Sequence, residues 1–232
     1  MITLRKSAER GHANHGWLDS YHSFSFANYY DKNFMGFRSL RVINEDRIAG
    51  GGGFPSHPHR DMEIITYMIE GRLEHQDSMG NKAIIKPGEV QRMSAGTGVV
   101  HSEANASKDE LAHLLQIWIM TNKNGHQPGY GQKDFSQEIK NKSLVLTASL
   151  SGRDGSIEIH QDVNLYLGRV KTGDTTSYEF KSNRYGWIQM IKGELHINQQ
   201  KLLPGDGAAI SDEKLIELKA INESEFLLFD LN

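Results

Sequence analysis

Short apolar segments separated by glycine turns dominate the first half of the chain. Segments rich in Ile, Val, Tyr and Thr, such as residues 64–69 and 114–120, alternate with turn signals at Gly71, residues 86–88 and Gly96. Stretches with the 3.6-residue period of a helix are hard to find. Many short strands between turns are typical of a sandwich or barrel, so the pattern predicts an all-β protein.

One pattern of strands and turns occurs twice. Residues 67–89 read as a strand, a turn at Gly71, a second strand and a Pro-Gly turn followed by an acid. Residues 189–206 repeat this order, with Gly193 at the first turn. The repeat predicts a duplicated β module, whose second copy carries no pair of histidines.

A polar, glycine-containing stretch lies between the two copies. Residues 128–142 contain Pro, Gly and charged residues, which favour a linker. We therefore expect two domains, at residues 1–133 and 134–232.

Two short segments carry the candidate chemistry: His57-Pro58-His59 and His101-Ser102-Glu103. In a strand, residues i and i+2 share a face, so two neighbouring strands would bring three imidazoles and one carboxylate together. Pro58 restricts His57 to extended backbone, which favours this geometry. Nitrogen-rich ligands suit a divalent transition metal better than calcium or magnesium, which prefer oxygen.

Other residues compete for a role at this site. Glu63 is an alternative carboxylate, which we expect to support the ligands or to line the pocket. His75 could line the cavity, although an ordinary strand histidine is the simpler interpretation. A Ser-His-acid triad is disfavoured because Ser102 would face away from its two neighbours. The remaining histidines are interpreted as structural (His12, His15 and His22) or without a role (His113, His126, His160 and His196).

Composition narrows the classes of partner and the compartment. The 232-residue chain has a formal net charge of -3 and no run of Lys or Arg, which argues against binding to nucleic acid or to an anionic membrane. It contains no cysteine, so thiolate metal sites and disulfides are excluded. The amino terminus lacks the apolar region of a signal peptide, and we expect a cytoplasmic protein.

These residues resemble a known family. The sequence from Gly51 through His57, His59 and Glu63 to Gly71 resembles the first cupin motif. Residues 87–103 resemble the second motif in the form found in pirins. Further stretches look like bacterial pirin-like proteins, close to the group described as quercetin 2,3-dioxygenases: residues 22–30, 35–37, 40–46 and 74–81.

The resemblance implies a bicupin, that is, two β-barrel (double-stranded β-helix) domains. It implies one metal in the amino-terminal cupin (residues 1–133), held by His57, His59, His101 and Glu103. The carboxyl-terminal cupin (residues 134–232) would lack the ligands. Iron is the expected metal, while copper, nickel, manganese and zinc stay open because ligand type alone does not select among them.

The resemblance also implies a reaction. The expected activity is a dioxygenase that cleaves the flavonol ring of quercetin-like substrates with O2 and releases CO, with Glu103 as the catalytic base. The expected partners are therefore a small flavonoid and O2, and the expected state is a monomer. Two alternatives are a redox-sensing regulatory binding protein without turnover and a zinc-dependent isomerase.

Overall fold

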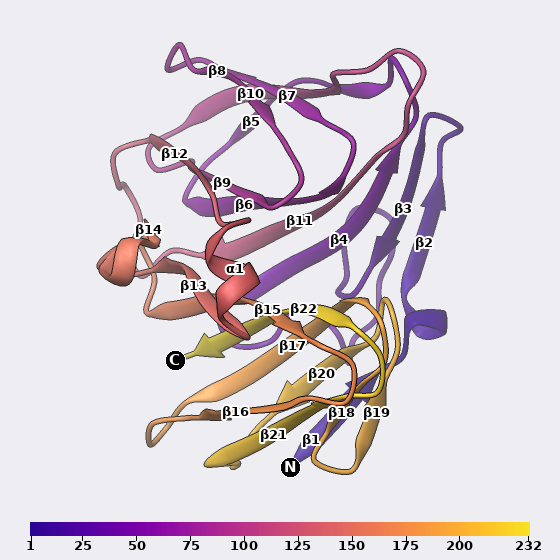
Figure 1. The fold of residues 1–232 in the computed structure, drawn as a ribbon. Helices are drawn as coiled ribbons and strands as arrows, with labels where there is room; N and C mark the ends of the chain where they lie inside the picture. Colours follow the sequence, from indigo (N-terminus) through magenta and orange to yellow (C-terminus); the bar gives the residue numbers. More distant parts are fainter. The chain divides into compact units, whose positions relative to one another are not determined.

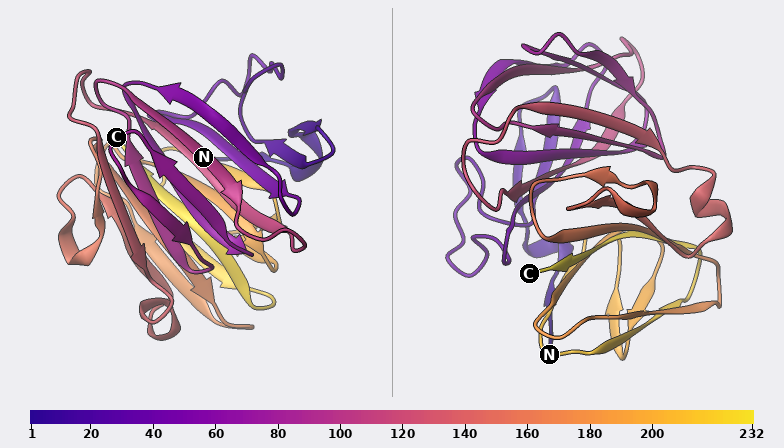
Figure 2. Two further views of the ribbon diagram at one scale, coloured as in Figure 1. Left: turned by 90° about the horizontal axis from the view of Figure 1, so that it is seen from above. Right: turned by 90° about the vertical axis from the view of Figure 1, so that its left-hand side faces the viewer.

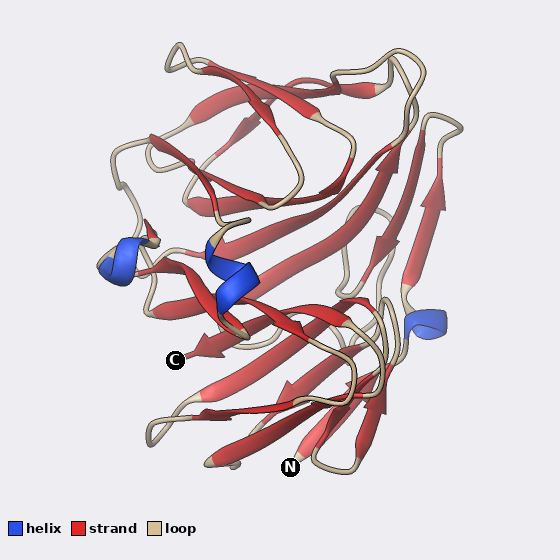
Figure 3. Ribbon diagram, viewed as in Figure 1, coloured by secondary structure: helices blue, strands red, loops and turns tan.

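Two compact β units make up the molecule, and the computed structural model describes all of residues 1–232. The amino-terminal unit comprises residues 11–136 and 157–161. The carboxyl-terminal unit comprises residues 1–10, 137–156 and 162–232. Strands form nearly all regular structure in both units, which confirms the all-β prediction (Figure 3).

The amino-terminal unit is built from two antiparallel sheets (Figure 1). One has seven strands in the order β12-β9-β6-β11-β4-β3-β2, and the other has four in the order β5-β10-β7-β8. Its strands are β2 (Gly11–Asn14), β3 (Leu18–His22), β4 (Leu40–Ile48), β5 (Gly53–His59), β6 (Met62–Glu70), β7 (Leu73–Asp77), β8 (Lys82–Ile85), β9 (Glu89–Ser94), β10 (Val99–Asn105), β11 (Ala112–Met120), β12 (Gly129–Asp134) and the short β14 (Ile157–Glu158).

An apolar core joins the two sheets of this unit. Ile48, Met68 and Leu114 from the seven-stranded sheet are buried in one cluster with Leu73 and Ile85 from the four-stranded sheet. Burial of these side chains provides the main driving force for closing the barrel. The predicted strands 64–69 and 114–120 fall within β6 and β11 and are confirmed.

Strand β10 alternates between interior and exterior, but its interior face is largely polar. Val99, His101, Glu103 and Asn105 are buried, whereas Val100 and the residues between them are more exposed. This is the two-residue period of a strand with one face in a core. The expected common face of His101 and Glu103 is confirmed.

The predicted linker at residues 128–142 is wrong for most of its length. Residues 129–134 form β12, which pairs with β9 at the edge of the seven-stranded sheet. Phe135 is buried, and a single helical turn, α1 (Glu138–Asn141), follows. Turn-like Gly and polar residues are compatible with an edge strand, where only one side of the strand needs a hydrogen-bonding partner.

The carboxyl-terminal unit repeats the two-sheet plan, and Figure 2 shows the sheets of each unit as separate layers. Its larger sheet contains β1-β20-β17-β22-β15-β13 in that order, and its smaller sheet is β16-β21-β18-β19. Its elements are β1 (Ile2–Arg5), the short helix η1 (Ser7–Glu9), α1, β13 (Leu144–Ser149), the short helix η2 (Arg153–Gly155), β15 (Val163–Val170), β16 (Thr175–Glu179), β17 (Tyr185–Lys192), β18 (Leu195–Ile197), β19 (Gln200–Leu202), β20 (Gly207–Ile210), β21 (Leu215–Ala220) and β22 (Ser224–Leu231).

The two units share the glycine turn that the repeat predicted. Gly71 has a φ of +76°, and a Cβ there would lie 2.3 Å from the Leu111 carbonyl oxygen. Gly193 has a φ of +86°, and a Cβ there would lie 2.3 Å from the Glu223 carbonyl oxygen. Both turns therefore need glycine for its left-handed conformation and for close backbone approach. None of the helices has the length and apolarity that crossing a membrane would need.

Candidate metal centre

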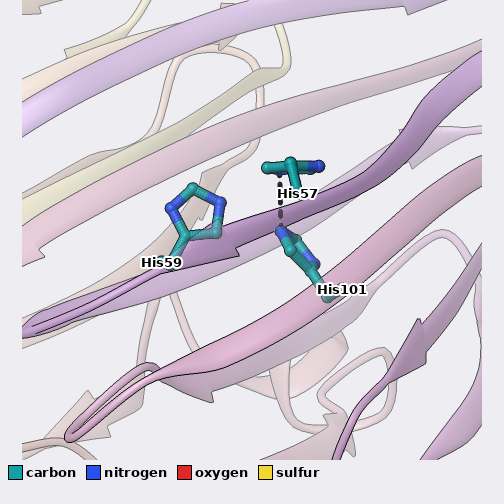
Figure 4. A group of neighbouring side chains, drawn as sticks. All are labelled: His57, His59 and His101. Atoms are coloured by element: carbon teal, nitrogen blue, oxygen red, sulfur yellow. Dashed lines mark hydrogen bonds between the residues drawn. The ribbon is translucent and has the colours of Figure 1, made fainter.

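Three histidines from two paired strands converge inside the amino-terminal unit (Figure 4). Strands β5 and β10 run antiparallel, with His57 opposite His101 and His59 opposite Val99. One nitrogen from each of His57, His59 and His101 lies within 4.8 Å of the other two. The antiparallel register thus brings the two sequence motifs side by side, as the spacing predicted.

The distance between two of these nitrogens suits a shared metal ion. Nε2 of His57 and Nε2 of His101 are 3.0 Å apart. Two nitrogen ligands at about 2.1 Å from a metal and at right angles to each other would be about 3.0 Å apart. His57 Nδ1 donates a hydrogen bond of 2.8 Å to the Pro55 carbonyl oxygen, which leaves the Nε2 lone pair free for a ligand.

The imidazoles are held in the form that a metal requires. Burial lowers the pKa of His59 to about 4, and the neighbouring His57 lowers it further in the same direction. Burial also lowers the pKa of His101 to about 3, with added repulsion from His57, His59 and His75. Both side chains are therefore neutral at pH 7 and offer lone pairs without first losing a proton.

Glu103 belongs to a second, overlapping group. A carboxylate oxygen of Glu103, a nitrogen of His101 and a nitrogen of His75 lie within 4.8 Å of one another. Gln116 Nε2 donates a hydrogen bond of 2.9 Å to Glu103 Oε2, while Oε1 is buried without a partner. Burial raises the pKa of Glu103 to about 7, against the opposing effect of the Gln116 hydrogen bond. Glu103 can therefore bind or release a proton near neutral pH.

A cavity of about 530 Å³ opens onto these side chains. Its apolar walls come from six side chains, namely Trp17, Leu18, Phe26, Phe54, Ile64 and Trp118. Its volume falls within the range of pockets for small organic ligands, which are about 300–1,000 Å³. The cavity can hold a flat aromatic molecule against the histidines.

One wall of the cavity is polar and comes from β3 and β4. Ser20 lies opposite Asp46, and His22 lies opposite Asn44, in the antiparallel register. The Ser20 hydroxyl donates a hydrogen bond to the Asp46 carboxylate, and His22 Nδ1 donates one of 2.8 Å to Asn44 Oδ1. Burial raises the pKa of Asp46 to about 6; the Ser20 hydrogen bond opposes this rise, and the charge of Glu45 adds to it.

The structure corrects the interpretation of two amino-terminal histidines. His15 and His22 line the cavity, although the sequence interpretation treated them as structural. The alternation of Leu18, Ser20 and His22 along one strand face was a signal that could have found His22. His12 instead pairs with Asp19 at 2.6 Å and stacks on Tyr21, which agrees with a structural role.

Glu63 does not support the site. It is buried on β6 but is not among the residues that line the cavity, whereas its neighbour Ile64 is. Its partners are His160 Nδ1 at 2.9 Å, the Ser94 hydroxyl at 2.8 Å and Arg92 Nε at 3.9 Å. The expectation that Glu63 lines the pocket is therefore wrong, because strand alternation turns it away from Ile64.

The remaining histidines contact carboxylates or other aromatic rings. His160, to which no role was given, pairs with Glu63, and His126 stacks on its ring. His113 and His196 pair with Glu45 and Glu194. His75 lies on β7, buried beside His101 and Glu103, and is not among the residues that line the cavity.

Comparisons with known proteins agree with this arrangement. Residues 3–119 match the family model described as Pirin, and residues 146–231 match the Quercetinase C-terminal cupin domain. The chain is 55% identical over 231 residues to a quercetin 2,3-dioxygenase of Escherichia coli K12, covering 100% of this chain and 99% of the relative. It is 40% identical to a pirin-like protein of Caulobacter vibrioides, covering 99% of both.

Solved structures of bacterial pirins have the same fold as this chain. The crystal structure of YhhW from Escherichia coli superposes with a TM-score of 0.97 at 53% identity, covering 100% of this chain and 98% of that one. A second structure is of bacterial pirin YhhW in complex with nickel(II), with a TM-score of 0.95. The fold and the histidine cluster define a bicupin whose amino-terminal cupin carries a metal site. Within that class, the chain belongs to the pirin family.

Proposed function

We propose that this protein is a quercetin 2,3-dioxygenase, which opens the flavonol ring of quercetin-like substrates with O2 and releases CO. One observation carries the proposal: three clustered imidazoles and a buried, proton-accepting Glu103 all face a cavity of about 530 Å³ with aromatic walls. The full-length relative in Escherichia coli that bears this name supports it.

The proposed ligands are His57, His59, His101 and Glu103, which would hold one divalent transition metal. Iron is the metal that we propose, and copper, nickel, manganese and zinc are the alternatives to test. The nickel(II) complex of the Escherichia coli relative supports a site for a divalent transition-metal ion. Four protein ligands would leave room on a six-coordinate ion for substrate and solvent.

A bound metal would supply Lewis acidity toward the substrate 3-hydroxyl and toward O2. The chain's own contribution begins with Glu103, whose partnerless Oε1 would accept the proton of that hydroxyl. Gln116 donates a hydrogen bond to the other carboxylate oxygen and would thereby orient the carboxylate of Glu103, which lines the cavity.

The cavity walls would orient the substrate. The indole of Trp118 lies edge-on to His59 at a ring-centroid distance of 4.9 Å, and Phe26 packs edge-on to Trp118 at 5.4 Å. Together they would bind the flat rings and exclude water from the reacting carbon atoms. Asp46 and Ser20 offer hydrogen-bonding groups for the substrate hydroxyls in the same cavity.

We also propose that only one of the two cupin domains binds metal. Residues 1–133 would supply the metal-binding cupin, apart from the first ten residues, which belong to the carboxyl-terminal unit. Residues 134–232 would supply most of a cupin without metal ligands. The active protein would be a cytoplasmic monomer, whose substrates are a small flavonoid and O2.

The test is turnover of quercetin by protein loaded separately with iron, copper, nickel and manganese. We expect the flavonol absorbance to fall in air, with matching O2 uptake and CO release, in at least one metal form. Metal-free protein and free metal ions with quercetin are the controls, because flavonols oxidise slowly without a protein. Unchanged absorbance in all four metal forms would overturn the proposal and favour the redox-sensing binding protein.

A further inference from the structure

His75 is a fully buried histidine beside the candidate ligands, and the proposed reaction gives it no part. Strand β7 pairs with β10 so that His75 lies opposite Glu103 and Asp77 lies opposite His101. The register therefore places the His75–Asp77 pair along the interior side of the strand that carries two of the proposed ligands. The rings of His75 and His101 are 5.4 Å apart between centroids.

Asp77 fixes the hydrogen on His75. His75 Nε2 donates a hydrogen bond of 3.0 Å to Asp77 Oδ2, and both side chains are completely buried. Asp77 accepts further hydrogen bonds from the Asn81 side chain at 2.9 and 3.1 Å and from the backbone N–H of Met79 and Asn81. Asp77 accepts all of these hydrogen bonds, so the hydrogen between His75 and Asp77 lies on His75 Nε2. The other ring nitrogen, Nδ1, can then serve as an acceptor.

One ring nitrogen of each of His75 and His101 has no hydrogen-bonding partner. These atoms are the two Nδ1 nitrogens, both buried. His57 carries its hydrogen on Nδ1, which donates to Pro55, so His57 Nε2 is the acceptor and His101 Nε2 the donor in the 3.0 Å contact. Each Nδ1 atom therefore carries a lone pair and no hydrogen, and two such acceptors cannot hydrogen-bond to each other.

A metal bound at His101 Nε2 would change which nitrogen of His101 carries the hydrogen. The ligating Nε2 would present its lone pair, so the hydrogen would lie on Nδ1, where it needs an acceptor. His75 Nδ1 is an unpartnered acceptor on the adjacent strand, and a nitrogen of His75 lies within 4.8 Å of one of His101.

We infer that the Asp77–His75 pair is a positioning device for the proposed metal ligand His101, accepting its Nδ1 hydrogen when metal is bound. This inference rests on the proposed metal site but not on quercetin as the substrate. Outer hydrogen-bonding partners of this kind orient a ligating imidazole and raise its basicity. Tyr130 packs against His75 at a ring-centroid distance of 5.1 Å and restrains that ring in turn.

The test measures metal binding rather than turnover. His75→Asn and Asp77→Asn are compared with the wild type in Ni²⁺ affinity, by competition with a chelator, and in the absorption spectrum of the Co²⁺ form. The matched control is His113→Asn, since His113 Nε2 also pairs with a carboxylate, Glu45, at 2.9 Å but lies outside both groups of candidate ligands. Circular dichroism checks that each variant folds.

We expect each of the two variants to bind Ni²⁺ about 10–100-fold more weakly, with one ion still bound at saturation and a shifted Co²⁺ spectrum. His113→Asn should change neither quantity. Wild-type affinity together with an unchanged spectrum in both variants would overturn the inference. Loss of binding in His75→Asn as complete as in His101→Ala would also overturn it, because His75 would then be a ligand itself.

Two further results keep the outcomes separate. If His75→Asn does not fold, the Asp77→Asn variant decides the question alone, because Asn keeps the size of Asp77 and removes its charge. If the affinity falls as expected while wild-type protein fails to consume quercetin, the positioning role stands and only the proposed substrate is lost.

Discussion

At the scale of single residues, Glu103 is proposed both as a metal ligand and as the catalytic base. It is buried beside His101, and its pKa is raised to about 7 by that burial. Replacing it with Gln keeps the size and removes the base. We expect Glu103→Gln to lower kcat by about 10²–10⁴-fold, while metal content at saturating metal falls much less. Quercetin turnover measured beside elemental analysis checks this. Equal losses of metal and of activity would assign Glu103 a ligand role alone.

The raised pKa of Glu103 also predicts how metal affinity depends on pH. Below pH 7 the carboxyl of the metal-free protein holds a proton that a metal must displace, so affinity should fall as the pH is lowered from about 7. His59 and His101 have pKa values of about 4 and 3 and stay neutral as the pH is lowered to about 5. They therefore contribute little to the pH dependence of metal affinity. Titration of Ni²⁺ at pH 5.5 to 8 measures the slope. Glu103→Gln should flatten it, and an equally steep slope in that variant would contradict the assignment.

Asp46 is the residue expected to select hydroxylated substrates. It lies in the cavity wall with Ser20 as its only hydrogen-bond donor on the side chain. A buried acceptor favours a ligand that brings a hydroxyl donor. We expect Asp46→Asn to raise KM for quercetin by about 5–30-fold at unchanged metal content, a loss of 1–2 kcal/mol. A flavonol without hydroxyls on its outer ring should lose less. Equal losses for both substrates would count against this role.

At the scale of elements, the site depends on how closely β5 approaches β10. A Cβ on Gly53 would lie 2.6 Å from the Glu103 carbonyl oxygen and 2.7 Å from the Ala104 Cα. The backbone of β5 can therefore pair with β10 here only because residue 53 has no side chain. The register between the two strands also shifts between His101 and Glu103, because β5 advances three residues, from His57 back to Phe54, where β10 advances two.

Gly53→Ala should push the two strands apart near the metal centre. We expect a loss of about 1–3 kcal/mol in the free energy of unfolding, as for other overpacked sites, and weaker Ni²⁺ binding. Thermal or urea unfolding and the metal titration measure the two effects. Gly129→Ala is the control, because a Cβ there would meet only the end of the flexible Arg92 side chain at 3.0 Å. Wild-type metal affinity in Gly53→Ala would show that the strand spacing does not control the site.

At the scale of the whole molecule, the two units use the same strand plan for different purposes. The carboxyl-terminal pair β16–β21 occupies the place that β5–β10 takes in the amino-terminal unit. In β21 the buried positions are Ile216, Leu218 and Ala220. In β10 they include His101, Glu103 and Asn105. An apolar interior supplies no lone pairs, so the second barrel is expected to be structural.

This difference predicts the metal stoichiometry. We expect one transition-metal ion per chain at saturation, and loss of most of this metal in the His101→Ala variant under the same conditions. Elemental analysis with a protein assay that is independent of metal gives the ratio. The fold should survive the substitution, which circular dichroism can check. A ratio near two ions per chain would show that the carboxyl-terminal unit has a site of its own.

The sequence by itself determined the all-β class, the repeat of a glycine turn in each unit, and the common face of His57 with His59 and of His101 with Glu103. These features depend on local rules: the two-residue period of a strand and the left-handed backbone that Gly71 and Gly193 must adopt. Such rules act between residues that are close along the chain. Patterns of neighbouring residues were therefore sufficient to predict these three features.

Only the tertiary structure decided which side chains meet across strands. The sequence could not show that β12 pairs with β9, that Glu63 turns to His160, or that His22 and Asp46 line the cavity. Nor could it show that His75 lies opposite Glu103. Register and barrel closure set these contacts, and both result from the packing of many distant residues at once. The electrostatic state of Glu103 and His101 follows from the same packing, because burial is the largest cause of both pKa shifts.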